Sequence, residues 1–61
     1  MDQYEKGIFV MDYLKTLGFD MITIGEFIDD KNLEKSYQTI FNNPKISKRE
    51  FLNKFGDSRG F

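Results

Sequence analysis

The chain has 61 residues, a net charge of −1, no Cys and no His, and 39% of its residues are hydrophobic. A chain of this length forms one domain, and its hydrophobic content together with its low net charge excludes intrinsic disorder. The missing Cys and His exclude disulfides, thiolate metal sites and the usual general base, and no apolar run approaches the roughly 20 residues that span a bilayer.

The first predicted helix covers residues 3–17, where hydrophobic residues recur at helical spacing. The face that we expect in the core holds Tyr4, Ile8, Val10, Met11, Leu14 and Leu17. Phe9 and Tyr13 are four residues apart and are expected to point away from that face. Gly18 is placed to end the helix in a left-handed turn.

Two segments share a local pattern in which a Thr or Ser precedes a Glu by three residues. The pattern comprises Ile22, Thr23, Glu26 and Phe27 in the first segment and Ile46, Ser47, Glu50 and Phe51 in the second. Each pair is spaced as a capping box, and the flanking Ile and Phe are spaced as a hydrophobic staple. The pattern therefore predicts helices over residues 24–30 and 48–55, the second of them ended by Gly56.

A further helix is predicted between these two, over residues 33–42. Its apolar stripe consists of Leu33, Tyr37, Ile40 and Phe41. Either Asp30 or Asn32 is expected to cap its start, and Pro44 prevents its continuation because the residue before a proline is disfavoured in the helical region.

The sequence thus predicts an all-α fold, a compact bundle of about four short helices over residues 3–17, 24–30, 33–42 and 48–55. We expect residues 1–56 to form the single domain and residues 57–61 to form a flexible tail. Asp2 and Glu5 precede the first apolar segment, unlike the basic start of a signal peptide, so the expected location is cytoplasmic.

The Ile-Ser-x-x-Glu-Phe sequence resembles the end of an EF-hand calcium loop. Taking Glu50 as the last ligand puts Pro44 at the position of the turning Gly, and taking Glu26 puts Lys15 at the first ligand position. Neither stretch can hold a calcium ion, because the ion requires oxygen ligands and the loop requires that Gly. No Gly-rich phosphate loop is present either, so we expect no metal and no cofactor.

Acidic residues are numerous enough to raise the question of an enzyme. They include Asp12, Asp20, Glu26, Asp29, Asp30 and Glu34. Without His or Cys, and with Ser47 explained as a helix cap, no nucleophile and base can be paired. A helical domain this small also has little room for a substrate pocket. We therefore expect a protein that is not an enzyme.

The first hypothesis for function is protein binding. Aromatic residues near the surface of a small domain are typical interface anchors, and acidic residues around them can steer a basic partner. The expected interface consists of Tyr4, Phe9, Tyr13, Asp12, Asp29 and Asp30. We predict a regulator or inhibitor that covers a site on a larger protein, with a residue bias that points to a phage or mobile element. A homodimer and a purely structural homo-oligomer stay open.

The alternative hypothesis is DNA binding. Residues 1–34 hold eight acidic and three basic residues, whereas residues 35–61 hold two acidic and six basic residues. The segment that starts the last helix resembles the turn and recognition helix of helix-turn-helix proteins, although Lys45 stands where that family usually has Gly. That resemblance implies nucleic-acid contacts from Lys45, Ser47, Lys48, Arg49 and Lys54.

Overall fold

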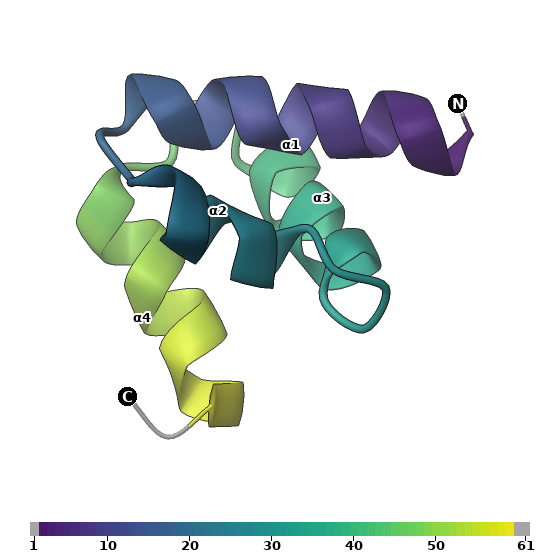
Figure 1. Cartoon of the computed structure of the whole chain (residues 1–61). Helices are drawn as coiled ribbons and strands as arrows, with labels where there is room; N and C mark the ends of the chain where they lie inside the picture. The colour runs from purple at the N-terminus through teal and green to yellow at the C-terminus, as the bar shows by residue number, and fades with distance from the viewer. Residues whose placement is uncertain (1, 60–61) are drawn as a thin grey trace.

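The computed structural model describes residues 2–59 and their side chains as far as Phe55. It contains four helices, α1 (Gln3–Thr16), α2 (Met21–Phe27), α3 (Leu33–Asn42) and α4 (Lys48–Arg59), and the described residues form no strand. Helix α1 lies across one side of the other three helices (Figure 1). The predicted all-α fold is confirmed. Among the described residues, no helix is long and apolar enough to cross a membrane.

Helix α1 has well-defined caps at both ends. The Asp2 carboxylate accepts a hydrogen bond from the Glu5 amide at 2.8 Å. At the other end Gly18 has a φ of +96°, and the Phe19 amide donates to the Leu14 carbonyl at 3.3 Å. This is a Schellman motif, which directs Phe19 back toward the core. The predicted helix end at Gly18 is confirmed.

Helix α2 begins and ends three residues earlier than predicted. Its N-cap is Asp20, whose carboxylate accepts from the Thr23 amide at 3.0 Å, so Thr23 lies inside the helix and does not cap it. Asp is a stronger N-cap than Thr. The predicted staple at Ile22 is also wrong, because this side chain is 79% exposed.

The start of α4 agrees with the predicted capping box. The Ser47 hydroxyl accepts from the Glu50 amide at 3.1 Å, and the Glu50 carboxylate accepts from the Ser47 amide at 3.2 Å. Helix α4 continues to Arg59, so the prediction that Gly56 ends it is wrong. Residues 60–61 of the predicted tail lie outside the described residues.

The core is built largely from phenylalanine rings. The Phe27 ring makes edge-to-face contacts with Phe19, Phe51 and Phe55, with ring centroids 5.6, 5.0 and 4.8 Å apart. The buried hydrophobic side chains are Val10, Leu14, Ile24, Phe27, Leu33, Ile40, Ile46, Phe51 and Phe55. Because Phe27 contacts rings from α4 and from the segment before α2, it joins these elements in one cluster.

The inward face of α1 differs from the predicted one. Val10 and Leu14 are fully buried, whereas Tyr4 is 76% exposed and Ile8 is 38% exposed, so their predicted core positions are wrong. Tyr13 was expected to point away from the core, but it packs against the core and its hydroxyl donates to the Ile46 carbonyl at 2.6 Å. Apolar residues surround most of α1, so periodicity alone could not select the buried face.

The inward face of α3 also differs in one position. Its bounds agree with the prediction, and Leu33 and Ile40 are buried as expected. Phe41, however, is 62% exposed, and Ser36 is buried instead. The Ser36 hydroxyl donates to the Phe27 carbonyl at 2.7 Å, which satisfies this polar group inside the core.

Candidate protein-binding groove

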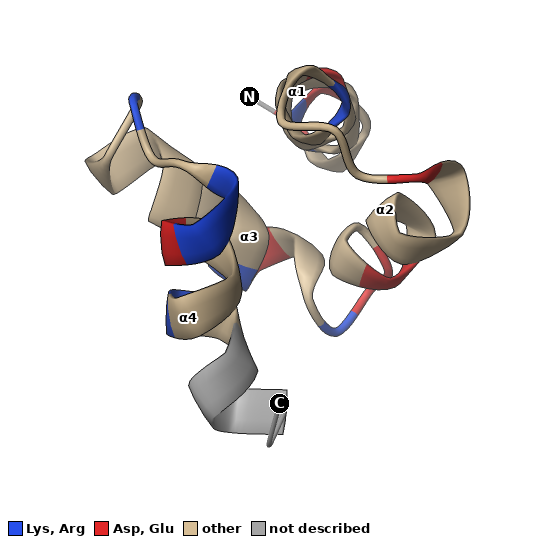
Figure 2. Cartoon of the chain, turned by 90° about the vertical axis from the view of Figure 1, so that its left-hand side faces the viewer, with Lys and Arg blue, Asp and Glu red and all other residues tan. Residues whose placement is uncertain are grey.

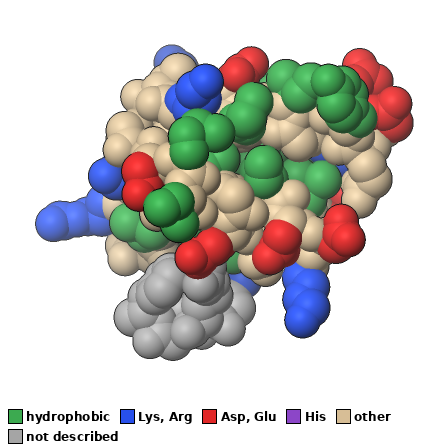
Figure 3. Space-filling model, in the orientation of Figure 1, with side chains coloured by type: hydrophobic (Ala, Val, Ile, Leu, Met, Phe, Trp, Pro, Cys, Tyr) green, Lys and Arg blue, Asp and Glu red, His purple; other side chains and the backbone are tan. Residues whose placement is uncertain are grey.

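An open groove of about 590 Å³ lies between α1 and the segment that joins α2 to α3. It is lined by Gln3, Tyr4, Gly7, Ile8, Met11, Ile28, Asp30 and Leu33. Figure 3 shows hydrophobic side chains gathered along α1 and over α2 on this side of the molecule, with acidic side chains at the margins. The groove is therefore mainly apolar.

One wall of the groove is the N-terminal half of α1. Tyr4 and Ile8 stand one turn apart on the helix, and both are exposed. Gly7 lies beside them, and a Cβ atom added at this position would have no heavy atom within 4 Å. The space above Gly7 is thus left open by the chain itself.

The opposite wall comes from the segment that joins α2 to α3. It contributes Asp30, an acidic residue, to the lining of the groove. The adjacent Asp29 carboxylate accepts from the amides of Lys31 and Asn32 at 3.0 and 2.9 Å, which fixes the turn before α3. Asn32 in turn donates from its side-chain amide to the Glu26 carbonyl at 2.8 Å. The wall therefore has a defined shape, although it lies outside the helices.

The charges of the molecule are separated in space as well as in sequence. Figure 2 shows acidic residues on α2 and on the segments at both of its ends, and a group of Lys and Arg on the turn before α4 and on the start of α4. The groove lies on the acidic side, because its second wall follows α2.

The residues predicted for a protein interface do not form one surface. Tyr4 and Asp30 line the groove, whereas Phe9, Asp12 and Tyr13 line a second hollow of about 270 Å³. The Tyr13 hydroxyl is already bonded within the fold. Sequence reasoning missed most of the groove, namely Gln3, Gly7, Met11, Ile28 and Leu33, and placed Ile8 in the core. The one signal of the groove in the sequence was Gly7, a glycine inside a predicted helix.

The aromatic side chains near the second hollow contact one another. The Phe9 and Tyr37 rings are 5.5 Å apart in an edge-to-face arrangement, and the Tyr37 and Phe41 rings are stacked at 5.7 Å. These rings cover the contact between α1 and α3. Phe9 is 39% exposed, but its ring also packs against α3 within the fold.

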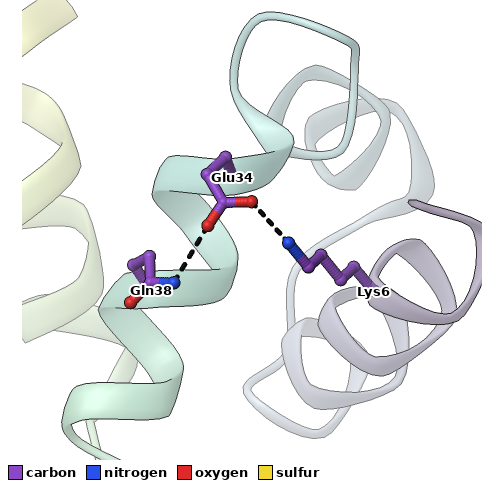
Figure 4. Close-up of polar contacts among 3 residues, drawn as sticks. All are labelled: Lys6, Glu34 and Gln38. Atoms are coloured by element: carbon purple, nitrogen blue, oxygen red, sulfur yellow. Dashed lines mark hydrogen bonds and ion pairs between the residues drawn. The ribbon is translucent and has the colours of Figure 1, made fainter. Parts of the chain in front are cut away.

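A polar clamp fastens α1 to α3 (Figure 4). The Lys6 ammonium lies 2.6 Å from one oxygen of Glu34, whose other oxygen accepts from Gln38 at 2.9 Å. The same ammonium lies 5.2 Å from the centre of the Tyr37 ring. Because Lys6 directly precedes Gly7, the clamp holds the part of α1 that lines the groove.

The clamp leads to a prediction of acid sensitivity. The hydrogen bond from Lys6, with a second from Gln38, holds the pKa of Glu34 below its ordinary value of 4.5. A carboxylate with a lowered folded-state pKa stabilises the fold above its unfolded-state pKa, and that stabilisation is lost as the pH falls through the folded-state pKa. Unfolding by urea should therefore occur at lower urea concentration at pH 3 than at pH 6.

The matched variant for this prediction is Glu34→Gln, measured over the same pH range. It should be less stable than the wild type at pH 6, and the difference should shrink as the pH falls toward 3, because protonation of Glu34 in the wild type removes the ion pair with Lys6. Added salt should also reduce the difference in stability between the two proteins, because the ion pair of Lys6 and Glu34 is exposed and salt screens it. A difference that is the same at both pH values would contradict the assigned role of Glu34.

The residues predicted to contact nucleic acid lie on the turn before α4 and on α4, and all five are exposed. Two of them have partners within the fold. The Ser47 hydroxyl caps α4, and the Lys48 ammonium lies 5.1 Å from the centre of the Phe19 ring. Lys45, Arg49 and Lys54 are the other exposed cations of this region.

The side chains that line the groove determine what it can bind. Among the described residues, no group of three or more acidic side chains is arranged to hold a metal ion. Of the described residues that line the groove, Asp30 is the only one with a charged side chain. A groove with this lining can bind apolar side chains, and Asp30 favours a positive charge beside them.

Comparison with known proteins identifies no family. No protein-family model matches the chain, and neither a curated protein nor a solved structure matches it.

Proposed function

We propose that the protein is a small non-enzymatic regulator that binds a larger protein through the groove beside α1 and covers a functional site on that partner. The observation that supports this proposal is the exposure of Tyr4 and Ile8 at the edge of an open apolar groove. Concentrated apolar surface on a small protein is typical of interaction sites.

The composition of the groove suits protein binding. Tyr is enriched among the residues that contribute most to interfaces, because it offers a large contact area and loses little side-chain entropy. Burying the apolar surface of Tyr4 and Ile8 would contribute about 25 cal/mol for each Å² removed from water. The clamp at Lys6 and the turn at Asp29 hold both walls in place before binding, which limits the entropy lost on association.

Occlusion is the mode of regulation that these features support. When the groove side of this protein binds a partner, it covers the contacted surface of that partner. Covering a functional site in this way blocks it without any chemical reaction. The cytoplasmic location expected from the sequence belongs to the same proposal, as does the absence of enzymatic activity.

Affinity capture from cells of the source organism tests the proposal. The wild type is compared with a double variant, Tyr4→Ala with Ile8→Ala, and with Phe41→Ala as the matched control. Phe41 is 62% exposed but does not line the groove. We expect the wild type and the control to capture a partner equally well. The double variant should bind that partner with an affinity lower by a factor of about 100, which corresponds to the loss of two contacts of moderate strength.

Regulation is then measured by adding the purified protein to an activity assay of the captured partner. Inhibition that saturates at one equivalent, and that the double variant does not produce, is the expected result. Equal capture of the partner by the wild type and the double variant would contradict the proposed surface.

DNA binding through α4 is a second candidate, and the exposure of Lys45, Arg49 and Lys54 favours it. It predicts salt-sensitive binding of duplex DNA that is unaffected by the groove variant, because contacts to phosphates release counterions. Such binding, without capture of a protein through the groove, would replace the first proposal.

A further inference from the structure

We propose that the groove receives one amphipathic helix of the partner, in which Lys or Arg stands beside the apolar residues. This inference rests on the proposed function and names the chemistry of the partner segment. Four features of the groove support it: its length, the absence of a strand edge, the open space at Gly7 and the charge of its second wall.

The length of the groove matches two turns of a helix. Its residues on α1 extend from Gln3 to Met11. Eight residue steps at 1.5 Å each give about 12 Å. A helix lying along this wall presents apolar residues at positions i, i+4 and i+7, which extend over about 10 Å. Three side chains of such a helix can therefore enter the groove together.

A helix fits this surface better than an extended segment does. An extended chain needs partners for its backbone amides and carbonyls, which a sheet edge supplies in proteins that bind by strand addition. The described residues of this protein form no strand and offer no such edge. A helix satisfies its own backbone groups and presents only side chains to an apolar groove.

Gly7 provides the space for close approach. A glycine inside a helix destabilises it by about 0.5–1 kcal/mol relative to alanine. Nothing in the fold requires glycine here, because an added Cβ atom would meet no heavy atom within 4 Å. The absence of a side chain instead deepens the groove between Tyr4 and Met11. A partner helix can then lie closer to α1 than any larger residue would allow.

The charge of the second wall favours a basic partner. Residues 26–31 contain three acidic residues and one basic residue, and Asp30 lines the groove itself. A second copy of this chain is a poor occupant. Its α1 and the cap before it hold three acidic and two basic residues, so this helix is not basic. Its basic helix α4 has its apolar face buried, with Phe51 and Phe55 in the core.

Two model peptides of about 15 residues test the inference, a length at which helices begin to be stable. Both carry Leu at positions that form one helical face. One has Lys at the remaining positions, and the other has Glu. Fluorescence anisotropy of the labelled peptides is measured at low salt. We expect the Lys peptide to bind saturably and at least about tenfold more tightly than the Glu peptide.

Two of these features, the open space at Gly7 and the charge of the second wall, are each tested by a matched pair of variants. Gly7→Leu should weaken binding of the Lys peptide by at least about tenfold by filling the groove, whereas Gly25→Leu, at another open glycine that does not line the groove, should leave it unchanged. Asp30→Lys should weaken binding by about threefold or more. Asp12→Lys changes the net charge equally, away from the groove, and should have little effect. Circular dichroism establishes that each variant is folded.

Three outcomes would overturn the inference. They are no saturable binding of the Lys peptide, equal binding of both peptides, and unchanged affinity in Gly7→Leu. A dimer in sedimentation that Gly7→Leu dissociates would also overturn it, by assigning the groove to a second copy. If cellular capture still depends on Tyr4 and Ile8 while the Lys peptide fails, the proposed function stands and only this partner chemistry is wrong.

Discussion

Replacing Phe27 with alanine should remove most of the stability of the fold, so that a large fraction of the molecules is unfolded at 25 °C. Phe27 is 1% exposed, and its ring contacts those of Phe19, Phe51 and Phe55. Removing a buried Phe side chain costs about 3–5 kcal/mol, because the transfer energy is lost and a cavity remains. A domain of this size without disulfides is stabilised by only about 3–5 kcal/mol in total. The substitution therefore removes most of the stability.

Urea unfolding followed by circular dichroism provides the measurement. The matched control is Phe41→Ala, in which the same side chain is removed from a position that is 62% exposed. It should change the free energy of unfolding by about 0.5–1.5 kcal/mol, because the stacking contact with Tyr37 is lost. A folded Phe27→Ala variant with a cooperative transition close to that of the wild type would show that the aromatic cluster does not hold the helices together.

Two glycines should respond in opposite directions to the same substitution. Gly18→Ala should destabilise the protein by about 1–2 kcal/mol, because the φ of +96° is unfavourable for any residue with a Cβ atom. Gly7→Ala should stabilise it by about 0.5–1 kcal/mol, because Gly7 is inside α1 and has open space around it.

Thermal unfolding resolves these two effects. In a domain of this size, 1 kcal/mol shifts the midpoint by about 4–8 °C. The midpoint should fall in Gly18→Ala and rise in Gly7→Ala. Both variants should still unfold in one cooperative transition. A midpoint for Gly18→Ala equal to that of the wild type would contradict the left-handed end of α1.

Helix boundaries were predictable where one local signal stood alone. Gly18 ends α1, and Ser47 with Glu50 begins α4, because no competing cap lies nearby. At α2 two caps compete, since Asp20 precedes Thr23 by three residues just as Thr23 precedes Glu26. The choice depends on which apolar residues become buried, and that is decided by the rest of the fold.

The groove could not be predicted, because it combines residues that are distant in sequence. Tyr4 and Ile8 match the apolar pattern of a core helix, but both are exposed in the folded chain. Similarly, the pairing of Tyr13 with the Ile46 carbonyl joins residues 33 positions apart. Local patterns predict which residues are apolar, but tertiary packing decides which of them remain at the surface.

The separation of charge between the α2 side and the start of α4 also affects how the molecule approaches a partner. An asymmetric charge distribution gives the protein a permanent electric dipole, and the field of a charged partner exerts a torque on that dipole before contact. At physiological salt this torque acts over about 8 Å. Toward a basic partner it turns the α2 side, with the groove and Asp30, forward, so a larger fraction of collisions begin in a productive orientation.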